Sequence, residues 1–320
     1  MATTTAHAAT QNAHPNLEVL AGGVAIITGG ASGIGLGLAE AAIQRGMYPV
    51  LADIESAAIT GAEASLQPAA EVAGVEVFGC SVDVSSAEAV TELGVAVSQR
   101  FPGKPISLLC CNAGVGGGGS VLTAKEIDWD FVLGVNVMGV ANCIRTFVPA
   151  MLDQGAPGTI VTTASQDGLC CAQGVYGVSK HASVALTEAL YSEVVGKLSV
   201  HVLCPNVVAT NIIKSERNRP AKYGGPPEVS SAREAGQKQI TERFKAFGMP
   251  PSRCAELVFD AIQSGEFYIL AEVEEDPGYV RLEAQTRMNA ILDGGLPSRP
   301  RSELLSKVFD LRRALPSNNR

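Results

Sequence analysis

The amino-acid sequence predicts an α/β fold in which a doubly wound parallel sheet of about seven strands carries helices on both faces. Short apolar segments alternate with longer amphipathic ones, which is the pattern of strands joined by helical crossovers. The apolar segments are almost continuously hydrophobic, as expected for strands covered on both faces. A glycine-rich turn at residues 28–35 follows the first of them. We therefore expect one sheet and one core domain.

The predicted strands are short, apolar or β-branched, and bounded by Gly, Pro or Asp. They are Val24–Thr28, Pro49–Asp53, Val75–Cys80, Ile106–Cys111, Thr159–Thr163, Val200–Cys204 and Phe267–Leu270. The predicted helices lie near residues 33–45, 56–66, 86–100, 124–152, 176–195 and 252–263. Because helices join successive strands, the strands are expected to run parallel.

Composition and charge exclude several classes of protein. Hydrophobic residues make up 46% of the chain and charged residues 18%, which argues against disorder as its main state. The net charge of −8 disfavours nucleic acid and anionic membrane surfaces as partners. The longest nearly apolar stretch, Phe131–Ile144, is interrupted by Asn136 and Asn142 and is shorter than the roughly 20 residues that span a bilayer. A soluble globular protein is expected.

The chain ends and the cysteines indicate a cytoplasmic protein. Residues 1–16 have neither the basic and apolar regions of a secretory signal nor the arginines of a mitochondrial one. None of the eight cysteines stands in a C-x-x-C motif, so reduced thiols are expected rather than a disulfide framework. Cys170 and Cys171 leave two readings open, packing in the core or lining a pocket. The histidines, His7, His14, His181 and His201, form no ligand cluster, so no metal is expected.

The glycine-rich turn has the features of a dinucleotide site. Gly29, Gly33 and Gly35 form the spacing G-x-x-x-G-x-G between a strand and a helix, where backbone amides can approach a pyrophosphate. Asp53 ends the second strand, close to the spacing of about 20 residues expected for a carboxylate that binds the adenine ribose. It would repel a 2′-phosphate, and the turn has no Arg or Lys, so NAD(H) is expected in preference to NADP(H). The alternative is an ordinary aspartate at a strand end.

A second group of residues is suited to acid–base chemistry. Tyr176 and Lys180 are separated by one helical turn and therefore share a face. A nearby ammonium stabilises the phenolate of a tyrosine and lowers its pKa towards neutrality. Ser165 lies at the end of the fifth predicted strand, where its hydroxyl could hold a substrate carbonyl.

Together these motifs resemble the short-chain dehydrogenase/reductase family, over about residues 22–270. The resemblance implies a Rossmann-like fold, a nicotinamide cofactor, a small-molecule substrate, and a homodimer or homotetramer. It implies that Tyr176 is the general acid/base, Ser165 positions the carbonyl or carbinol, Lys180 binds the nicotinamide ribose and lowers the Tyr176 pKa, and Asn136 holds a water in a proton relay. The residues placed at the cofactor are Thr28, Gly29, Ser32, Gly33, Ile34, Gly35, Asp53, Asp83, Val84, Asn112, Ala113, Gly114, Tyr176, Lys180, Pro205, Val208 and Thr210.

Two departures from the family pattern concern the substrate side. Pro205-Asn206 stands where the family usually has Pro-Gly, so the backbone turn near the nicotinamide is expected to differ. The interval between Ser165 and Tyr176 is slightly shorter than usual.

The domain organisation follows from these segments. We expect a disordered tail at 1–20, a dinucleotide-binding catalytic domain at 21–275, and a helical extension and tail at 276–320 with a helix at 278–292. Within the domain, 206–250 is rich in Pro and Gly and is predicted to be a mobile lid without one long helix. Its Arg217, Arg219, Lys222 and Tyr223 either meet a polar substrate group or are solvated. The basic residues of the tail, Arg299, Arg301, Arg312, Arg313 and Arg320, are expected to be solvated.

The substrate loop at 215–224 looks like that of bacterial NAD-dependent dehydrogenases that oxidise the benzylic Cα alcohol of lignin-derived aryl ethers. The predicted function is therefore interconversion of a secondary alcohol and a ketone on a bulky aryl or polycyclic substrate. Two alternatives are an NADPH-dependent ketoreductase of a biosynthetic pathway and a catalytically inactive cofactor-binding or sensor protein.

Overall fold

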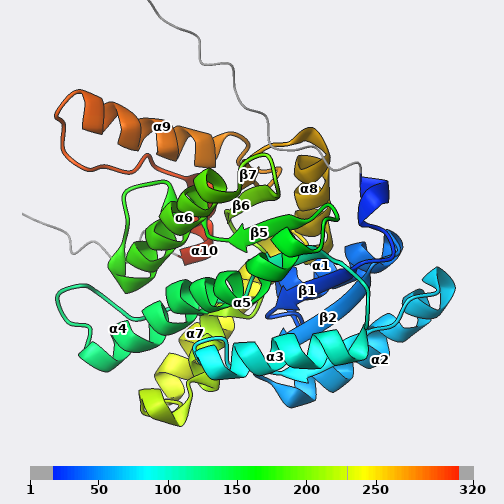
Figure 1. Cartoon of the computed structure of the whole chain (residues 1–320). Coiled ribbons are helices and arrows are strands. Elements are labelled where there is room, and N and C mark those ends of the chain that lie inside the picture. The colour runs from blue at the N-terminus through cyan, green and yellow to red at the C-terminus, as the bar shows by residue number, and fades with distance from the viewer. Residues whose placement is uncertain (1–16, 229, 310–320) are drawn as a thin grey trace, which may run out of the picture.

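The computed structural model describes residues 17–228 and 230–309, and within them a parallel sheet has the strand order β3-β2-β1-β4-β5-β6-β7 (Figure 1). Every neighbouring pair of strands runs parallel. The strands are β1 Val24–Thr28, β2 Tyr48–Asp53, β3 Phe78–Ser81, β4 Ile106–Cys111, β5 Thr159–Thr163, β6 Ser199–Pro205 and β7 Tyr268–Ala271. The predicted doubly wound fold is confirmed.

Helices cover both faces of this sheet. The α-helices are α1 Gly33–Gln44, α2 Ser56–Ala73, α3 Ala87–Arg100, α4 Glu126–Leu133, α5 Gly139–Asp153, α6 Gly174–Val194, α7 Ser231–Phe247, α8 Pro251–Ser264, α9 Tyr279–Leu292 and α10 Glu303–Phe309. Short turns of other helix types are η1 Leu17–Leu20, η2 Gly134–Met138, η3 Gln166–Gly168, η4 Ile212–Asn218 and η5 Ala221–Tyr223, of which η2 is a π-helical turn.

The strands contribute alternate side chains to two separate hydrophobic layers. Ala25 and Ile27 of β1 pack with α1, α2 and α8, whereas Val24 and Ile26 pack with α3, α5 and α6. All four side chains are almost completely buried, because successive residues of a strand point to opposite faces and both faces are covered. This burial explains why the strands are hydrophobic at every position.

Two helices are longer than the sequence predicted. The prediction ended α2 before Pro68, but the helix continues to Ala73, and the buried Leu66 and Ala70 extend its apolar face across the proline. The prediction for 206–250 allowed no long helix and is wrong for its second half, which forms the 17-residue α7. Apart from Pro250, the prolines and the glycine pair of this segment fall at 220–227, so residues 231–247 are free of helix breakers other than Gly236.

The most apolar helical region passes through the interior of the domain. Residues 126–153 are long and apolar enough to cross a membrane by length and composition, yet 61% of their most apolar window is buried inside the fold. Asn136 and Asn142 are buried and form hydrogen bonds within the protein. These are the properties of a core helix, and the π-helical turn η2 interrupts its regular winding at Asn136.

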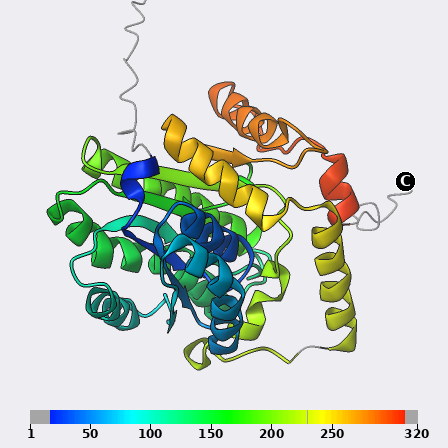
Figure 2. The ribbon, with the colours of Figure 1, turned by 90° about the vertical axis from the view of Figure 1, so that its right-hand side faces the viewer.

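The terminal segments are more ordered than predicted. Leu17–Leu20 was assigned to a disordered tail but forms η1, with Leu20 fully buried; residues 1–16 and 310–320 lie outside the described residues. Towards the other end, α10 (red) lies against α7 (yellow-green), as Figure 2 shows, and the Phe244 and Phe309 rings are 5.8 Å apart. The division at 275/276 stays a prediction, but the extension packs closely on the core.

Two helical glycines should respond oppositely to substitution by alanine, which favours a helix over glycine by about 1 kcal/mol. A Cβ at the buried Gly37 of α1 would lie 2.7 Å from the backbone oxygen of Pro251 in α8, whereas one at the exposed Gly61 of α2 would have nothing within 4 Å. We expect Gly61→Ala to raise the free energy of unfolding by roughly 0.5–1 kcal/mol and Gly37→Ala to lower it by about 1–3 kcal/mol. Denaturant titration measures both; stabilisation by Gly37→Ala would contradict the close helix crossing.

Candidate active site

A cavity of about 1290 Å³ opens at the carboxyl ends of the strands, where a doubly wound sheet binds its ligand. This volume exceeds the range of about 300–1,000 Å³ typical of a pocket for one small molecule, as a dinucleotide together with a substrate would require. The predicted site residues that line it are Gly29, Ser32, Gly33, Ile34, Asp53, Asp83, Val84, Asn112, Ala113, Gly114, Ser165, Tyr176, Lys180, Pro205, Val208 and Thr210. Thr28, Gly35 and Asn136 are not part of the lining and support it from behind.

The tight turn between β1 and α1 requires glycine at particular positions. Gly29 and Gly33 have φ angles of +64° and +54°, which favour glycine. A Cβ on Gly35 would lie 2.0 Å from the carbonyl oxygen of Gly29. Ser32 is the N-cap of α1, but its side chain forms no capping hydrogen bond, so the first-turn amides can serve an anion. These features fit the pyrophosphate of a dinucleotide.

Thr28 and Asn112 fasten this turn to β4 and β5. The Thr28 hydroxyl donates to the Cys110 carbonyl and accepts from the amides of Asn112 and Ala113, at 2.9 and 3.0 Å. The Asn112 amide group donates to the Thr28 carbonyl at 2.9 Å, and its oxygen accepts from the Thr163 hydroxyl at 3.0 Å. The carboxyl ends of three strands are therefore joined by side-chain hydrogen bonds.

Asp53 and Asp83 lie at the other end of the cavity, after β2 and β3. The carboxylate of Asp53 accepts hydrogen bonds from the amides of Ala31 and Glu55, at 3.1 and 3.2 Å, so it also braces the glycine turn. Asp83 accepts from Ser85 and pairs with Lys222 at 2.9 Å. Burial opposes ionisation of Asp83, but the hydrogen bonds from Ser85 and Lys222 hold its pKa below the ordinary value.

Ser165, Tyr176 and Lys180 meet at the floor of the cavity. Ser165, after β5, and Tyr176, in the first turn of α6, both line the cavity, and the Ser165 hydroxyl acts to lower the pKa of Tyr176. The Lys180 ammonium lies 5.6 Å from the Tyr176 ring centroid and donates to the Thr163 carbonyl at 3.0 Å. Lys180 is only 2% exposed, so its ammonium is oriented by the protein rather than by water.

Burial dominates the titration of both α6 side chains. It raises the pKa of Tyr176, the negative charge of Asp167 raises it further, and the hydrogen bond from Ser165 opposes these effects. Burial also lowers the pKa of Lys180 to about 8. Burial therefore acts on the Tyr176 pKa in the direction opposite to the depression expected from Lys180, because a low dielectric penalises the charged form of each group.

Asn136 has a supporting position. Its side-chain oxygen accepts from the Val115 amide at 2.8 Å, and its amide group donates to the Val115 carbonyl and the Ser179 hydroxyl, both at 2.9 Å. Its own carbonyl accepts from the Ser183 hydroxyl at 2.9 Å. Asn136 thus holds the loop after Asn112–Gly114 against α6.

Asn206, at the nicotinamide end of the cavity, is held by its backbone rather than by its side chain. Its backbone amide donates to the Ala271 carbonyl at 2.9 Å and so continues the pairing of β6 with β7. Both polar atoms of its side chain are buried without a protein partner. Val208 pairs with Met249, and Thr210 packs against Gly33, so the segment closes the cavity beside the glycine turn.

The predicted basic residues of the 206–250 segment form ion pairs with carboxylates of the core domain. Arg217 and Asn218 bind Glu55, Arg219 pairs with Asp128 at 2.8 Å, and Lys222 pairs with Asp83. The ring of Tyr223 packs on Phe131, with centroids 5.6 Å apart. These contacts tie the segment across the adenine half of the cavity. Arg219 is buried, so solvation is wrong for that residue. Arg217 lines the cavity and Lys222 is exposed, so substrate contact and solvation both stay open for these two.

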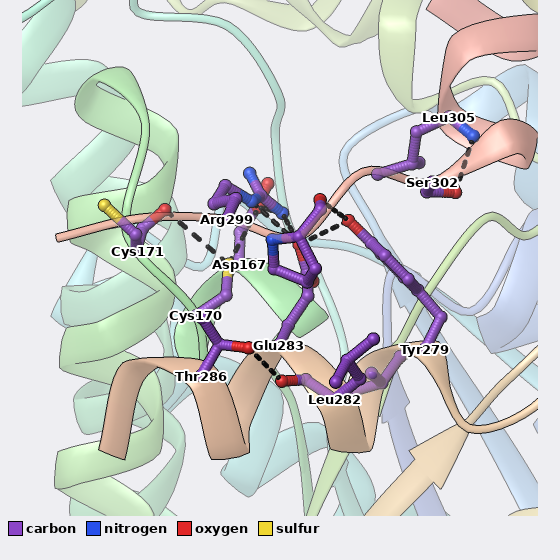
Figure 3. A network of polar contacts seen from close by, with 12 residues as sticks. Asp167, Cys170, Cys171, Tyr279, Leu282, Glu283, Thr286, Arg299, Ser302 and Leu305 are labelled. Atoms are coloured by element: carbon purple, nitrogen blue, oxygen red, sulfur yellow. Dashed lines mark hydrogen bonds and ion pairs between the residues drawn. The ribbon is translucent and has the colours of Figure 1, made fainter. Parts of the chain in front are cut away.

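The substrate half of the cavity contains residues that the sequence did not reveal. Phe244, Tyr279, Arg299, Pro300, Ser302, Leu305, Ser306 and Phe309 line it, together with Asp167. Arg299 was predicted to be solvated, but its side chain is only 16% exposed and pairs with Asp167 and Glu283 (Figure 3). The four-residue spacing of Leu304 and Val308, both buried in α10, is the local sequence signal that could have predicted this helix.

Cys170 is buried and Cys171 half-buried, and neither lines the cavity, so Cys170 packs in the core.

Comparisons with known proteins agree with this geometry. Residues 23–221 match the family described as short chain dehydrogenase. The chain is 33% identical over 278 residues to the C alpha-dehydrogenase of Sphingobium sp. strain SYK-6, covering 86% of this chain and 87% of the relative. A short-chain dehydrogenase/reductase from Burkholderia phymatum, solved in complex with NAD, is 36% identical, with a TM-score of 0.78 and coverage of 88% and 99%. L-sorbose reductase from Gluconobacter frateurii, solved with NADPH and L-sorbose, is 27% identical, with a TM-score of 0.62 and coverage of 79% and 94%.

The glycine turn, the serine and tyrosine that line the same cavity, and the lysine one helical turn away occur in a chain whose family match covers more than half its length. The chain belongs to the short-chain dehydrogenase/reductase family, whose members are NAD(P)-binding oxidoreductases of alcohols and ketones.

Proposed function

We propose that the protein interconverts a bulky secondary alcohol and its ketone with NAD(H), and that Tyr176 is the general acid/base. The observation that carries this proposal is that Ser165 and Tyr176 line the same cavity, with Lys180 buried one helical turn from Tyr176. A tyrosine in contact with the space next to the nicotinamide end can exchange a proton with a substrate oxygen.

Each residue has one task in the reaction. A nicotinamide cofactor held in this cavity would supply hydride transfer from the alcohol or to the ketone. Ser165 holds the substrate oxygen by a hydrogen bond, and Tyr176 takes its proton or gives it back. Lys180 is cationic below pH 8 and supplies positive charge near the Tyr176 ring. Asn136 orients the surrounding backbone, and its water-holding role stays a prediction.

The preference for NAD(H) is supported by the charges at the adenine end. Asp53 and Glu55 both lie at the end of β2, where a 2′-phosphate would meet two carboxylates. Arg217 is the nearby cation, and Glu55 already pairs with it. The relative from Burkholderia phymatum was solved with NAD and that from Gluconobacter frateurii with NADPH, so family membership alone leaves either cofactor open.

The substrate class follows from the lining of the far half of the cavity. Phe244, Tyr279, Leu305 and Phe309 provide an apolar wall that suits an aryl or polycyclic body. The resemblance to the C alpha-dehydrogenase supports an aryl alcohol. The competing proposal, an NADPH-dependent biosynthetic ketoreductase, is disfavoured by Asp53, and an inactive sensor is disfavoured by the intact Ser165, Tyr176 and Lys180. The cytoplasmic location and the homodimer or homotetramer stay predictions.

Removing the Tyr176 hydroxyl should separate catalysis from cofactor binding. We expect Tyr176→Phe to lower kcat by at least a hundredfold, since general acid–base catalysis contributes roughly 10²–10⁴. NADH affinity, measured by cofactor fluorescence, should stay near wild type because the hydroxyl acts on the proton. Tyr268→Phe, which removes an exposed hydroxyl bound to Glu188, is the control. More than about a tenth of wild-type kcat, or roughly 1.4 kcal/mol of barrier, would exclude Tyr176 as the acid/base.

Asp53 should determine cofactor choice. The wild type is expected to have a higher kcat/KM with NAD(H) than with NADP(H), and Asp53→Ala should narrow or reverse that ratio, because it removes both the ribose acceptor and the repulsion of a 2′-phosphate. Arg253→Ala, on the exposed face of α8, should leave the ratio unchanged. A native protein that uses NADPH as efficiently as NADH would refute this assignment.

The 206–248 segment should open and close over the cofactor. Its Arg217–Glu55 and Lys222–Asp83 pairs are partly exposed, so each contributes at most about 1 kcal/mol and opening is inexpensive. We expect NADH to slow hydrogen exchange strongly at residues 212–224 and little in α8. Equal protection with and without cofactor would mean that the segment is a fixed wall rather than a lid.

A further inference from the structure

Arg299 lies between two carboxylates at the boundary between the C-terminal extension and the loop that carries Ser165 (Figure 3). Its Nε donates to Glu283 Oε1 at 2.8 Å, and its Nη2 lies 2.9 Å from Asp167 Oδ1 and 2.8 Å from Glu283 Oε1. We propose that Arg299 is a positioning residue for proton transfer by Tyr176, because it fixes Asp167 and offsets its negative charge beside Tyr176. This inference rests on the proposed function.

Asp167 is close enough to the catalytic group to affect it. It follows Ser165 by two residues in η3, and its backbone amide donates to the Ser165 hydroxyl at 3.2 Å. After burial, the charge of Asp167 is the next largest influence that raises the pKa of Tyr176. A carboxylate in this position disfavours the phenolate that must form when Tyr176 accepts a proton from an alcohol. A cation bound to Asp167 reduces that penalty.

The groups around Asp167 come from several elements, and only some of them carry charge. Cys170 of the same loop donates its thiol proton to Asp167 at 3.6 Å, and burial raises the pKa of that thiol. Helix α9 contributes Glu283 and Tyr279, helix α6 contributes Tyr176 and Lys180, and β6 contributes Cys204 beside Lys180. Lys180 is directed to the Thr163 carbonyl. When Asp167 and Glu283 are both ionised, the two carboxylates carry a charge of −2. The positive charge of Arg299 reduces the total for the three groups to −1.

The position of Arg299 is imposed by the extension that carries it. Tyr279 donates to Glu283 and to the Pro300 carbonyl, at 2.9 and 3.0 Å, and Ser302 donates to Asp276 at 2.6 Å. The Glu283 side chain is fully buried, and its carboxylate accepts a hydrogen bond from Nε of Arg299. The Arg299 Nη2 is within ion-pair distance of both carboxylates but is not aligned for a hydrogen bond to either, so its effect on Asp167 is mainly electrostatic.

The experiment compares pH profiles of alcohol oxidation for the wild type, Arg299→Met, Asp167→Asn and the double variant. Oxidation requires unprotonated Tyr176, so a higher Tyr176 pKa moves the rise of kcat/KM to higher pH. We expect Arg299→Met to move its midpoint up by about one pH unit, a tenfold loss below the midpoint. Asp167→Asn should move it down, and the double variant should lie nearer to Asp167→Asn than to Arg299→Met. Arg299→Lys should stay near wild type.

The control is Arg281→Met, which removes an exposed arginine of α9 two residues from Glu283 and should leave the midpoint unchanged. A purely structural role would lower kcat/KM equally at every pH with an unmoved midpoint, and that result overturns the inference. If Arg299→Met does not fold, the nearly isosteric Asp167→Asn is used as the test instead. An unchanged midpoint of the kcat/KM profile in that variant overturns the inference as well.

A second measurement needs no turnover. The ultraviolet titration of the Tyr176 phenolate in the NAD⁺ complex, taken as the difference from Tyr176→Phe, should move in the same order across the variants over the range in which circular dichroism shows an intact fold. Coincident titrations overturn the inference. Shifted titrations in a protein that oxidises no alcohol would instead confirm that Arg299 and Asp167 act on the Tyr176 phenolate, and would reject the proposed function and with it the role in proton transfer.

Discussion

Side-chain hydrogen bonds that join the carboxyl ends of β1, β4 and β5 position the rest of the site. Thr28 binds the backbone after β4, Asn112 binds back to Thr28 and accepts from Thr163, and the Thr163 carbonyl receives the ammonium of Lys180. The glycine turn, the strand ends and α6 are thereby held in one arrangement. Because all these groups are buried or half-buried, losing one would leave its partners unsatisfied at a cost of about 1–3 kcal/mol each.

Burial also determines how readily Tyr176 and Lys180 ionise. A tyrosine and a lysine in a low-dielectric floor both resist ionisation, which raises the pKa of Tyr176 and lowers that of Lys180. The acid–base role proposed for Tyr176 therefore depends on the charges around its hydroxyl. The hydrogen bond from Ser165 lowers its pKa, whereas Asp167 raises it, and Arg299 is placed to moderate Asp167.

The two halves of the cavity are built differently. The cofactor half consists of backbone turns at adjacent strand ends, which the sheet brings together automatically. The other half is assembled from α7, α9, α10 and the segments between them, and the Arg299–Asp167 ion pair joins the C-terminal extension to the loop after β5. A short-chain dehydrogenase can thus retain the first half while the second half sets the size and polarity of its substrate.

The sequence by itself determined the fold and the cofactor half, because the signals are local: alternating apolar segments, glycines with a fixed spacing, and Tyr176 and Lys180 one helical turn apart. It missed the end of α2, the helix α7 and the order of Leu17–Leu20, where burial against distant elements overrides Pro68 or a weak local pattern. Arg219 and Arg299 look like solvated charges in the sequence. Only the tertiary structure brings Asp128 and Asp167 to them, from 91 and 132 positions away, and the charge of a side chain carries no information about which distant carboxylate it will meet.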